Sequence, residues 1–377
     1  MATTCASLLH LPSPSFFPLL SSKTSHFLHS PLSQQYPYSH SLYHSTFPTV
    51  SFSQTPPHHL MSKYGKWVFN SLTVRSESKP SINREPMLPP YNVLITGSTK
   101  GIGYALAKEF LKAGDNVVIC SRSADGVESA VQQLRQEFGE QHVWGTQCDV
   151  REGQDVKDLV AFAQRSLGYI DIWVLIRFNY ILLHLENMQI NNAGSNAYSY
   201  KPLAEASDED LIEVVATNSL GLMICCREAI KMMLNQPRGG HIFNIDGAGS
   251  DGRPTPRFAA YGATKRSVVH LTKSLQSSLI FHRQNCGCKM SKMLPGMVTT
   301  DLLMSGATTK QAKFFINVLA EPAEVVAEYL VPNIRSILAN GSTKPTYIRF
   351  LTGLKAYTQI FSRIAFGARR NRYVPED

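Results

Sequence analysis

The sequence predicts an α/β protein built as one domain around a doubly wound parallel sheet. Three observations lead to this fold class. Apolar runs alternate with amphipathic runs from about residue 90 to residue 335, as expected for a parallel sheet with helices on both faces. A glycine-rich turn connects the first apolar run to the first helical run. A tyrosine and a lysine at i and i+4, Tyr261 and Lys265, lie in a later helical run.

The glycine-rich turn, residues 96–103, predicts a binding site for a dinucleotide pyrophosphate. It follows Asn92-Val93-Leu94-Ile95, which is predicted to be the first strand, and it opens a helical run from Tyr104 to Ala113. Glycines in such a turn let phosphates approach the backbone N–H groups at a helix N-terminus. We therefore expect cofactor contacts from Gly97, Ser98, Lys100, Gly101, Ile102 and Gly103.

Tyr261 and Lys265 form a candidate pair for proton transfer. Their spacing places the phenol and the ammonium on one face of a helix. A neighbouring ammonium lowers the pKa of a phenol, which lets the phenol exchange a proton near neutral pH. A YxxxK motif alone occurs often by chance, so this inference depends on the other motifs.

Three motifs together resemble those of the short-chain dehydrogenase/reductase family. The family has a TGxxxGxG turn, an NNAG turn and a YxxxK helix, and this chain has 96–103, Asn191-Asn192-Ala193-Gly194 and Tyr261 to Lys265 in the same order. The resemblance implies a Rossmann-type domain that transfers hydride from a nicotinamide cofactor. It implies that Tyr261 donates a proton, Lys265 binds the nicotinamide ribose and Asn218 holds a water in a proton relay. It also implies cofactor contacts from Asp149, Val150, Asn192, Ala193, Gly194, Pro295, Gly296 and Thr300.

The end of the second predicted strand favours NADPH over NADH. Val117 to Cys120 is that strand, and Ser121-Arg122 follows it. NAD enzymes usually carry an acid here to bind the ribose 2′-hydroxyl, whereas an arginine suits a 2′-phosphate. Lys100 in the glycine turn adds a second positive charge. We therefore expect Ser121 and Arg122 to bind NADPH, with NADH as the second choice and a solvated strand end as the other interpretation of Arg122.

The predicted catalytic loop departs from the family pattern. The usual Asn-Ile-Ser-Ser is here Asn244-Ile245-Asp246-Gly247, so neither of the last two residues offers a hydroxyl to a substrate carbonyl. Ser250 is the nearest candidate for that role, although it lies closer to Tyr261 than the family spacing has it. Asp246 is interpreted as a structural acid that caps the loop.

Val174 to Gln189 interrupts the fourth predicted strand. Deleting this segment would join Trp173 to Ile190 and restore a regular buried strand before the NNAG turn. We interpret 174–189 as an aberrant insertion, such as an unspliced intron read in frame. The alternative is that Val174 to Phe178 replaces the strand and the rest loops out beside the cofactor.

Residues 277–294 are atypical for the strand expected before Pro295-Gly296. They contain one β-branched residue, Ile280, so the sixth strand is predicted to be missing. Together with the segment 174–189, this stretch makes an inactive or misfolded isoform an alternative to an active enzyme.

Residues 1–87 are interpreted as a transit peptide and disordered linker that precede a catalytic domain over 88–340. The first acidic residue is Glu77, and the segment before it is rich in serine without a regular period. An ordinary disordered tail is the alternative. The net charge of +9 comes from the two ends of the chain, because residues 88–338 have equal numbers of basic and acidic side chains. We therefore expect no nucleic-acid partner.

Residues 341–377 are predicted to form a basic amphipathic extension. A helical projection from Arg349 places cations on one side and apolar side chains on the other, and Arg369, Arg370 and Arg372 follow. The apolar arc consists of Phe350, Leu354, Tyr357, Phe361 and Ile364. Such a helix can lie on an anionic membrane surface. Packing of the arc on the domain is the alternative.

Within the family, the runs 91–103, 243–252 and 295–304 resemble plant reductases that act on chlorophyll(ide) b. The resemblance implies NADPH-dependent reduction of the C7 formyl group to hydroxymethyl, in the chloroplast and peripherally on the stromal side of the thylakoid membrane. It implies contact with light-harvesting complexes and a homo-oligomer or a complex with a related reductase. A plastid 3-oxoacyl carrier-protein reductase is the alternative enzyme, although it would have a Ser-Ser loop and no basic extension. An apolar wall for a macrocycle is predicted from Leu302, Leu303, Met304, Phe314, Phe315 and Ile316.

The seven cysteines are scattered and mostly lie in apolar runs, as reduced cysteines do. Their spacing gives no metal-binding pattern, so no metal site is expected. No apolar run has the length of about 18 to 20 residues that a membrane-spanning helix needs.

Overall fold

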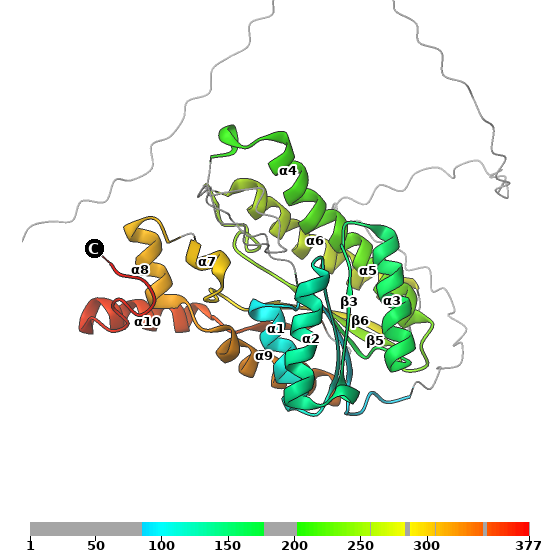
Figure 1. The fold of residues 1–377 in the computed structure, drawn as a ribbon. Coiled ribbons are helices and arrows are strands. Elements are labelled where there is room, and N and C mark those ends of the chain that lie inside the picture. The colour runs from blue at the N-terminus through cyan, green and yellow to red at the C-terminus, as the bar shows by residue number, and fades with distance from the viewer. Residues whose placement is uncertain are drawn as a thin grey trace, which may run out of the picture. The chain divides into compact units, whose positions relative to one another are not determined.

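A seven-stranded parallel sheet forms the centre of the computed structural model, which describes residues 85–176, 202–256, 258–282, 287–305, 307–341 and 345–376 (Figure 1). The strand order is β3-β2-β1-β4-β5-β6-β7, and every pair of neighbours is parallel. The predicted doubly wound fold is therefore confirmed. The strands are β1 Asn92–Thr96, β2 Asn116–Ser121, β3 Val143–Gln147, β4 Ile172–Leu175, β5 Gly240–Ile245, β6 Cys288–Leu294 and β7 Tyr347–Arg349.

Helices cover both faces of the sheet. Successive residues of each strand point to opposite faces, so the sheet and its helices form two separate apolar cores. One core contains side chains from α1 Gly101–Lys112, α2 Ala124–Phe138 and α9 Ala323–Ala339. The other contains side chains from α3 Gly153–Leu167, α5 Gly221–Leu234 and α6 Ala259–His282. The remaining helices are α4 Asp208–Val215, α7 Asp301–Ser305, α8 Lys310–Leu319 and α10 Gly353–Phe366, with a π-helical turn over Ala216–Leu220 and short 3₁₀ turns at Glu140–His142 and Leu203–Glu205.

Strand β4 includes the first residues of the segment interpreted as an insertion. Val174 pairs with Ile95 of β1 and Phe243 of β5, and its side chain is fully buried. Leu175 continues the strand and is equally buried. Val174 and Leu175 thus continue the strand, as expected if Val174 to Phe178 replaces its end. The rest of the interval lies outside the described residues.

The predicted absence of a sixth strand is wrong, because Cys288–Leu294 forms β6 between β5 and β7. Cys288 and Met290 point into one apolar core and Met293 into the other. Ser291 is buried and hydrogen-bonds His241 of β5 at 2.8 Å. Burial against neighbours outweighs the low β propensity of this segment, since propensity largely measures such packing.

The C-terminal extension begins with a strand and not with the predicted helix. Arg349 ends β7, and the adjacent Phe350 is 7% exposed, so neither lies on α10. α10 packs on α8, and its Arg363 is buried and ion-paired with Glu376. Arg363 therefore faces the protein and not solvent. No helix in the described ranges is long and apolar enough to cross a membrane.

Candidate active site

The glycine turn lies at the carboxyl end of β1, where the strand order reverses between β1 and β4. Open α/β sheets bind ligands in the crevice at such a reversal. A Cβ atom on Gly103 would lie 2.3 Å from the carbonyl oxygen of Gly97, so only glycine fits this approach of α1 to the turn. Ser98 ties the turn to β1 and β2, since its hydroxyl donates to Ile95 O at 2.6 Å and accepts from Cys120 N at 3.1 Å. The turn is thus shaped for a close backbone approach by a pyrophosphate.

The segment after β6 meets the glycine turn. A Cβ atom on Gly101 would lie 3.2 Å from Cγ2 of Thr300, so the predicted contact residue Thr300 stands beside the turn. Thr300 immediately precedes α7, and its hydroxyl accepts from Leu303 N at 3.4 Å. Burial lowers the pKa of Lys100, and the nearby Asp301 carboxylate works in the opposite direction. Thr300 and the start of α7 therefore lie beside the glycine turn, and the predicted cofactor contacts of Pro295 and Gly296 stay predictions.

Tyr261 and Lys265 lie in α6 against the loop that follows β5. Nζ of Lys265 is 5.5 Å from the centroid of the Tyr261 ring, and Lys265 is 2% exposed. A Cβ atom on Gly247 would lie 2.7 Å from the Tyr261 hydroxyl oxygen and 3.1 Å from Cε of Lys265. A serine at position 247 would therefore displace the phenol or the lysine. Glycine at position 247 therefore lets this loop lie close to both side chains.

Asn218 lies beside this pair in the π-helical turn between α4 and α5. Its Nδ2 donates to the Thr264 hydroxyl at 3.0 Å, and that hydroxyl donates to the backbone oxygen of Tyr261 at 2.7 Å. Oδ1 of Asn218 is buried and has no hydrogen-bond partner among the described residues. A buried acceptor of this kind fits the predicted role of holding a water. The role of Thr264 in linking Asn218 to Tyr261 was not predicted from the sequence, although Thr264 lies within the YxxxK motif.

The two polar residues of the catalytic loop face different surroundings. Asp246 is buried, and its Oδ2 lies 3.6 Å from Nζ of Lys292 on β6. Burial raises the pKa of Asp246, while Lys292 acts against that rise. Ser250 is 5% exposed, donates its backbone N–H to Gly247 O at 3.1 Å and accepts from Arg266 at 2.8 Å through its carbonyl. Both contacts use backbone atoms, so its action on a substrate carbonyl stays a prediction.

Charged side chains gather where β2 and β3 end, at the predicted adenosine end of the site. Arg122 is ion-paired with Glu213 of α4, with Nη1 3.4 Å from Oε1. Arg151 contacts both Asp149, where its Nε lies 2.9 Å from Oδ2, and Glu213. Burial works to raise the pKa of Asp149, but hydrogen bonds from Arg151 lower it below its usual value. Arg151 and Glu213 were not predicted, because neither lies in a recognised motif. Ser121 and Val150 are the sequence neighbours of this cluster, and their contact with the cofactor stays a prediction.

The NNAG turn, including the predicted contacts Asn192, Ala193 and Gly194, lies outside the described residues. The strand leading toward it ends against the glycine turn. Thr96 accepts from the backbone N–H of Ile176 at 3.0 Å and donates to its carbonyl at 3.2 Å. Ile176 is thereby fixed beside Gly97.

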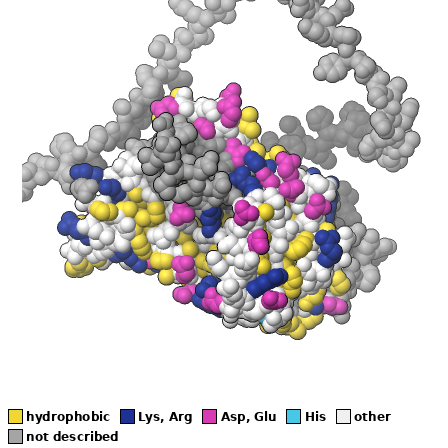
Figure 2. Space-filling model, in the orientation of Figure 1, with side chains coloured by type: hydrophobic (Ala, Val, Ile, Leu, Met, Phe, Trp, Pro, Cys, Tyr) yellow, Lys and Arg dark blue, Asp and Glu magenta, His cyan; other side chains and the backbone are white. Residues whose placement is uncertain are grey.

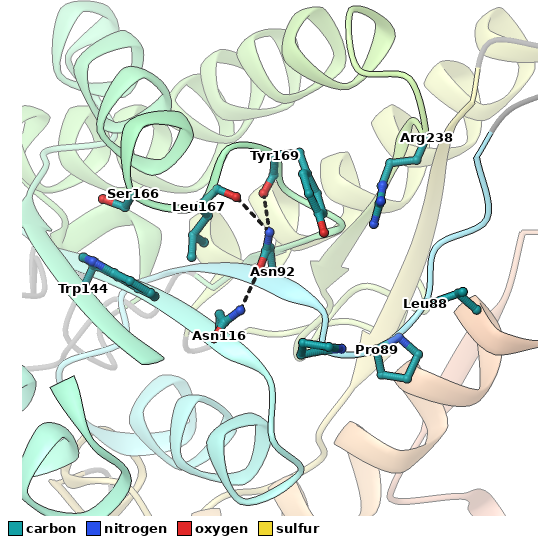
Figure 3. Close-up of a pocket in the computed structure, with 10 residues that line it drawn as sticks. Leu88, Pro89, Asn92, Asn116, Trp144, Ser166, Leu167, Tyr169 and Arg238 are labelled. Atoms are coloured by element: carbon teal, nitrogen blue, oxygen red, sulfur yellow. Dashed lines mark hydrogen bonds between the residues drawn. The ribbon is translucent and has the colours of Figure 1, made fainter. Parts of the chain in front are cut away.

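A separate cavity of about 440 Å³ opens at the amino ends of the strands, on the opposite edge of the sheet (Figure 3). Asn92 lines this cavity, and its Nδ2 donates to the carbonyl oxygens of Leu167 and Tyr169, both at 3.1 Å. Arg238 stacks over the Tyr169 ring at 4.0 Å. None of the predicted site residues lines this cavity, so it is distinct from the candidate active site.

The chain belongs to the short-chain dehydrogenase/reductase family, because the short chain dehydrogenase family matches residues 91–311. It is therefore an oxidoreductase of the NAD(P)H-dependent class. It is 74% identical over 301 residues to "Chlorophyll(ide) b reductase NOL, chloroplastic" of Arabidopsis thaliana, covering 80% of this chain and 81% of that protein. The protein of the same description in Oryza sativa subsp. japonica is 73% identical over 308 residues, which are 81% of this chain and 85% of that protein.

Solved structures show the same fold at low sequence identity. The crystal structure of a variant actinorhodin polyketide ketoreductase with NADPH has a TM-score of 0.57 and 24% identity to this chain. The match covers 71% of this chain and 99% of the ketoreductase. This similarity supports the fold and says nothing further about the substrate.

Proposed function

We propose that this chain reduces the C7 formyl group of chlorophyll(ide) b to a hydroxymethyl group with NADPH. The observation that carries the proposal is the identity of 73–74% to two chloroplastic reductases named for chlorophyll(ide) b. The alignments extend over four fifths of the chain, so the aligned region includes Tyr261. The arrangement of Tyr261, Lys265 and Asn218 supplies the proton chemistry that such a reduction needs.

The side chains of the site divide the work of the reaction. NADPH, when bound, supplies the hydride for the formyl carbon. The Tyr261 hydroxyl donates its proton to the oxygen as that oxygen becomes an alkoxide. Lys265, buried against the phenol ring, favours the phenolate that remains. Asn218 offers its Oδ1 as the acceptor that holds a water, and that water returns a proton to the site.

The preference for NADPH follows from positive charge near the adenosine end. Arg122 directly follows β2 with no acid beside it in sequence, and Lys100 lies in the glycine turn. An arginine fork binds a phosphate through two parallel hydrogen bonds, which favours a 2′-phosphate over a 2′-hydroxyl. NADH remains the second choice of cofactor.

Part of the predicted apolar wall is available to a macrocycle. Phe314 and Phe315 of α8 are partly exposed and meet edge to face, with centroids 5.4 Å apart. Leu303 and Met304 of α7 are also partly exposed. Ile316 is 2% exposed and packs inward, so its predicted place in the wall is wrong. Such aromatic and aliphatic side chains suit a flat apolar ligand.

Incubation of the full chain with NADPH and either chlorophyllide b or a 3-oxoacyl thioester tests the proposal. We expect reduction of the formyl group of chlorophyllide b to hydroxymethyl and little turnover of the thioester, because the loop lacks a serine at positions 246 and 247. Faster turnover of the thioester would instead identify a 3-oxoacyl reductase. Cofactor binding without turnover of either substrate would indicate the inactive isoform.

We also propose that residues 1–87 direct the chain to the chloroplast, where it acts at the stromal face of the thylakoid membrane. The membrane contact is supported by four apolar side chains along one side of α10 that are each 65–76% exposed: Leu354, Tyr357, Phe361 and Ile364. Figure 2 shows hydrophobic side chains gathered over α8 and α10, with basic side chains around them. An exposed apolar helix face rimmed by cations is typical of interfacial helices. The same surface could reach pigment in light-harvesting complexes.

Fewer cations are available for this contact than the sequence suggests. Arg369 and Arg372 are both ion-paired with Glu321, at 2.9 and 3.0 Å. Lys355 lies over the Phe350 ring at 3.6 Å, and Arg370 is exposed. We therefore assign most of the membrane affinity to the apolar side chains.

A homo-oligomer, or a complex with a related reductase, is the second partner that we propose. An apolar stripe runs along α4, the π turn and α5, at helical spacing. Its members are Ile212, Val215, Leu220 and Met223, which are 46–67% exposed. Contiguous exposed apolar side chains of this kind commonly form protein interfaces.

A further inference from the structure

Glu213 holds a position in the adenosine end of the site that the reductase chemistry does not explain. It lies in α4 and contacts two arginines that follow different strands, Arg122 after β2 and Arg151 after β3. Its Oε1 also accepts from the Thr217 hydroxyl at 3.4 Å. Glu213 is therefore the carboxylate that faces the arginine expected to bind the 2′-phosphate.

The cluster is balanced in charge. Arg122 and Arg151 supply two positive charges, and Asp149 and Glu213 supply two negative charges. The four side chains are 18–30% exposed, so water screens them only in part. Glu213 Oε1 lies 3.4 Å from Nη1 of Arg122, so a 2′-phosphate that binds Arg122 would lie close to this carboxylate. The two negative charges would then repel each other.

We propose that Glu213 competes with the cofactor 2′-phosphate for Arg122 and so limits the preference for NADPH over NADH. This inference depends on the proposed function, in which NADPH is the hydride donor. Glu213 is then a specificity-determining residue that acts on the phosphate through Arg122. The sequence motif around Arg122 therefore overstates the preference for the phosphate.

Glutamine at position 213 removes the charge and keeps one hydrogen-bond acceptor. Its amide oxygen can still accept from Thr217, so α4 and the adjoining π turn should keep their structure. Glu209→Gln is the matched control, because Glu209 lies in the same helix and is exposed. The probes are adenosine 2′,5′-bisphosphate and adenosine 5′-monophosphate, which differ only in the 2′-phosphate.

Titration calorimetry on the full chain gives the dissociation constants of both probes. We expect Glu213→Gln to tighten binding of the bisphosphate about tenfold, as removal of one repulsive charge contact would. Binding of the monophosphate should stay within about twofold, and Glu209→Gln should match the wild type. The double variant Arg122→Gln/Glu213→Gln should lose the gain, which an effect on folding alone would not produce.

The possible results separate this inference from the proposed function. Unchanged or weaker binding of the bisphosphate by Glu213→Gln would overturn the competition. A gain that persists in the double variant would also overturn it, because the phosphate would then not use Arg122. Failure of the wild type to bind either probe would instead contradict the nicotinamide-dependent function.

Discussion

Burial sets the direction in which the pKa of Asp171, next to the central strand β4, is shifted. Asp171 is 0% exposed, accepts from Asn92 N at 3.0 Å, and has Oδ1 3.8 Å from Nη1 of Arg238. Burial raises the pKa of Asp171 to about 6. The hydrogen bond from Asn92 and the charge of Arg238 act in the other direction and are weaker.

Asp171→Asn should change how stability depends on pH. The folded pKa of Asp171 lies above its unfolded value, so its contribution to stability is fully present below about pH 4 and is lost as pH rises through about 6. The wild type should therefore lose up to about 3 kcal/mol of unfolding free energy relative to the variant between pH 4 and 7. Urea unfolding across this range measures the difference. Parallel curves for the two proteins would contradict the assignment, and the exposed Asp208→Asn is the control.

At the same scale, the sequence predicted site residues that belong to short motifs and missed those that depend on tertiary contacts. Tyr261, Lys265 and Asn218 were predicted, and the structure places them together around the loop after β5. Thr264 and Glu213 are positioned by neighbours on other elements. No local pattern shows such contacts.

At the scale of elements, β4 and β6 show how packing can replace a regular sequence pattern. Val174 and Leu175 fill the centre of the sheet as apolar residues of suitable size. In β6, Met290 and Met293 do the same without branched side chains. Counting β-branched residues therefore failed for β6, because methionine adapts its shape to a core.

Deletion of Val174 to Gln189 should raise the free energy of unfolding. The new junction places Ile190 after Trp173, so a branched apolar residue takes over the pairing of Val174 with Ile95 and Phe243. The deletion also brings the NNAG turn directly to the end of the strand. Denaturant unfolding of the full and shortened chains measures the change. Unfolding of the shortened chain at lower denaturant would show that the segment belongs to the fold.

At the scale of the whole molecule, the C-terminal extension is part of the domain. Ile348 and Phe350 are buried, and β7 pairs with β6. Glu321, which binds Arg369 and Arg372, also accepts from Thr299 N through its carbonyl at 2.9 Å. The extension thus supports the segment that borders the active site. Removal of residues 346–377 would disturb the fold, so point substitutions test the membrane contact better.

The variant Leu354→Ser/Tyr357→Ser/Ile364→Ser should lose binding to anionic liposomes. These three side chains are 74–76% exposed, so their loss should cost little stability, while each apolar side chain contributes about 1 to 2 kcal/mol to insertion. Sedimentation with vesicles at moderate salt measures the effect. Leu203→Ser/Val325→Ser is the control, since both residues are exposed on other elements. Equal sedimentation of the triple variant and the wild type would exclude α10 as the membrane contact.

The most direct test of the proposed reaction is the rate of chlorophyllide b reduction by Tyr261→Phe with NADPH bound. Phenylalanine keeps the ring and its edge contact with Phe258, at 6.1 Å between centroids, but removes the proton donor. Turnover should fall about 10²- to 10⁴-fold while the affinity for NADPH changes little. Tyr169→Phe, at the opposite edge of the sheet, should keep the wild-type rate (Figure 3). Turnover by Tyr261→Phe at the wild-type rate would contradict the assignment of Tyr261 as proton donor.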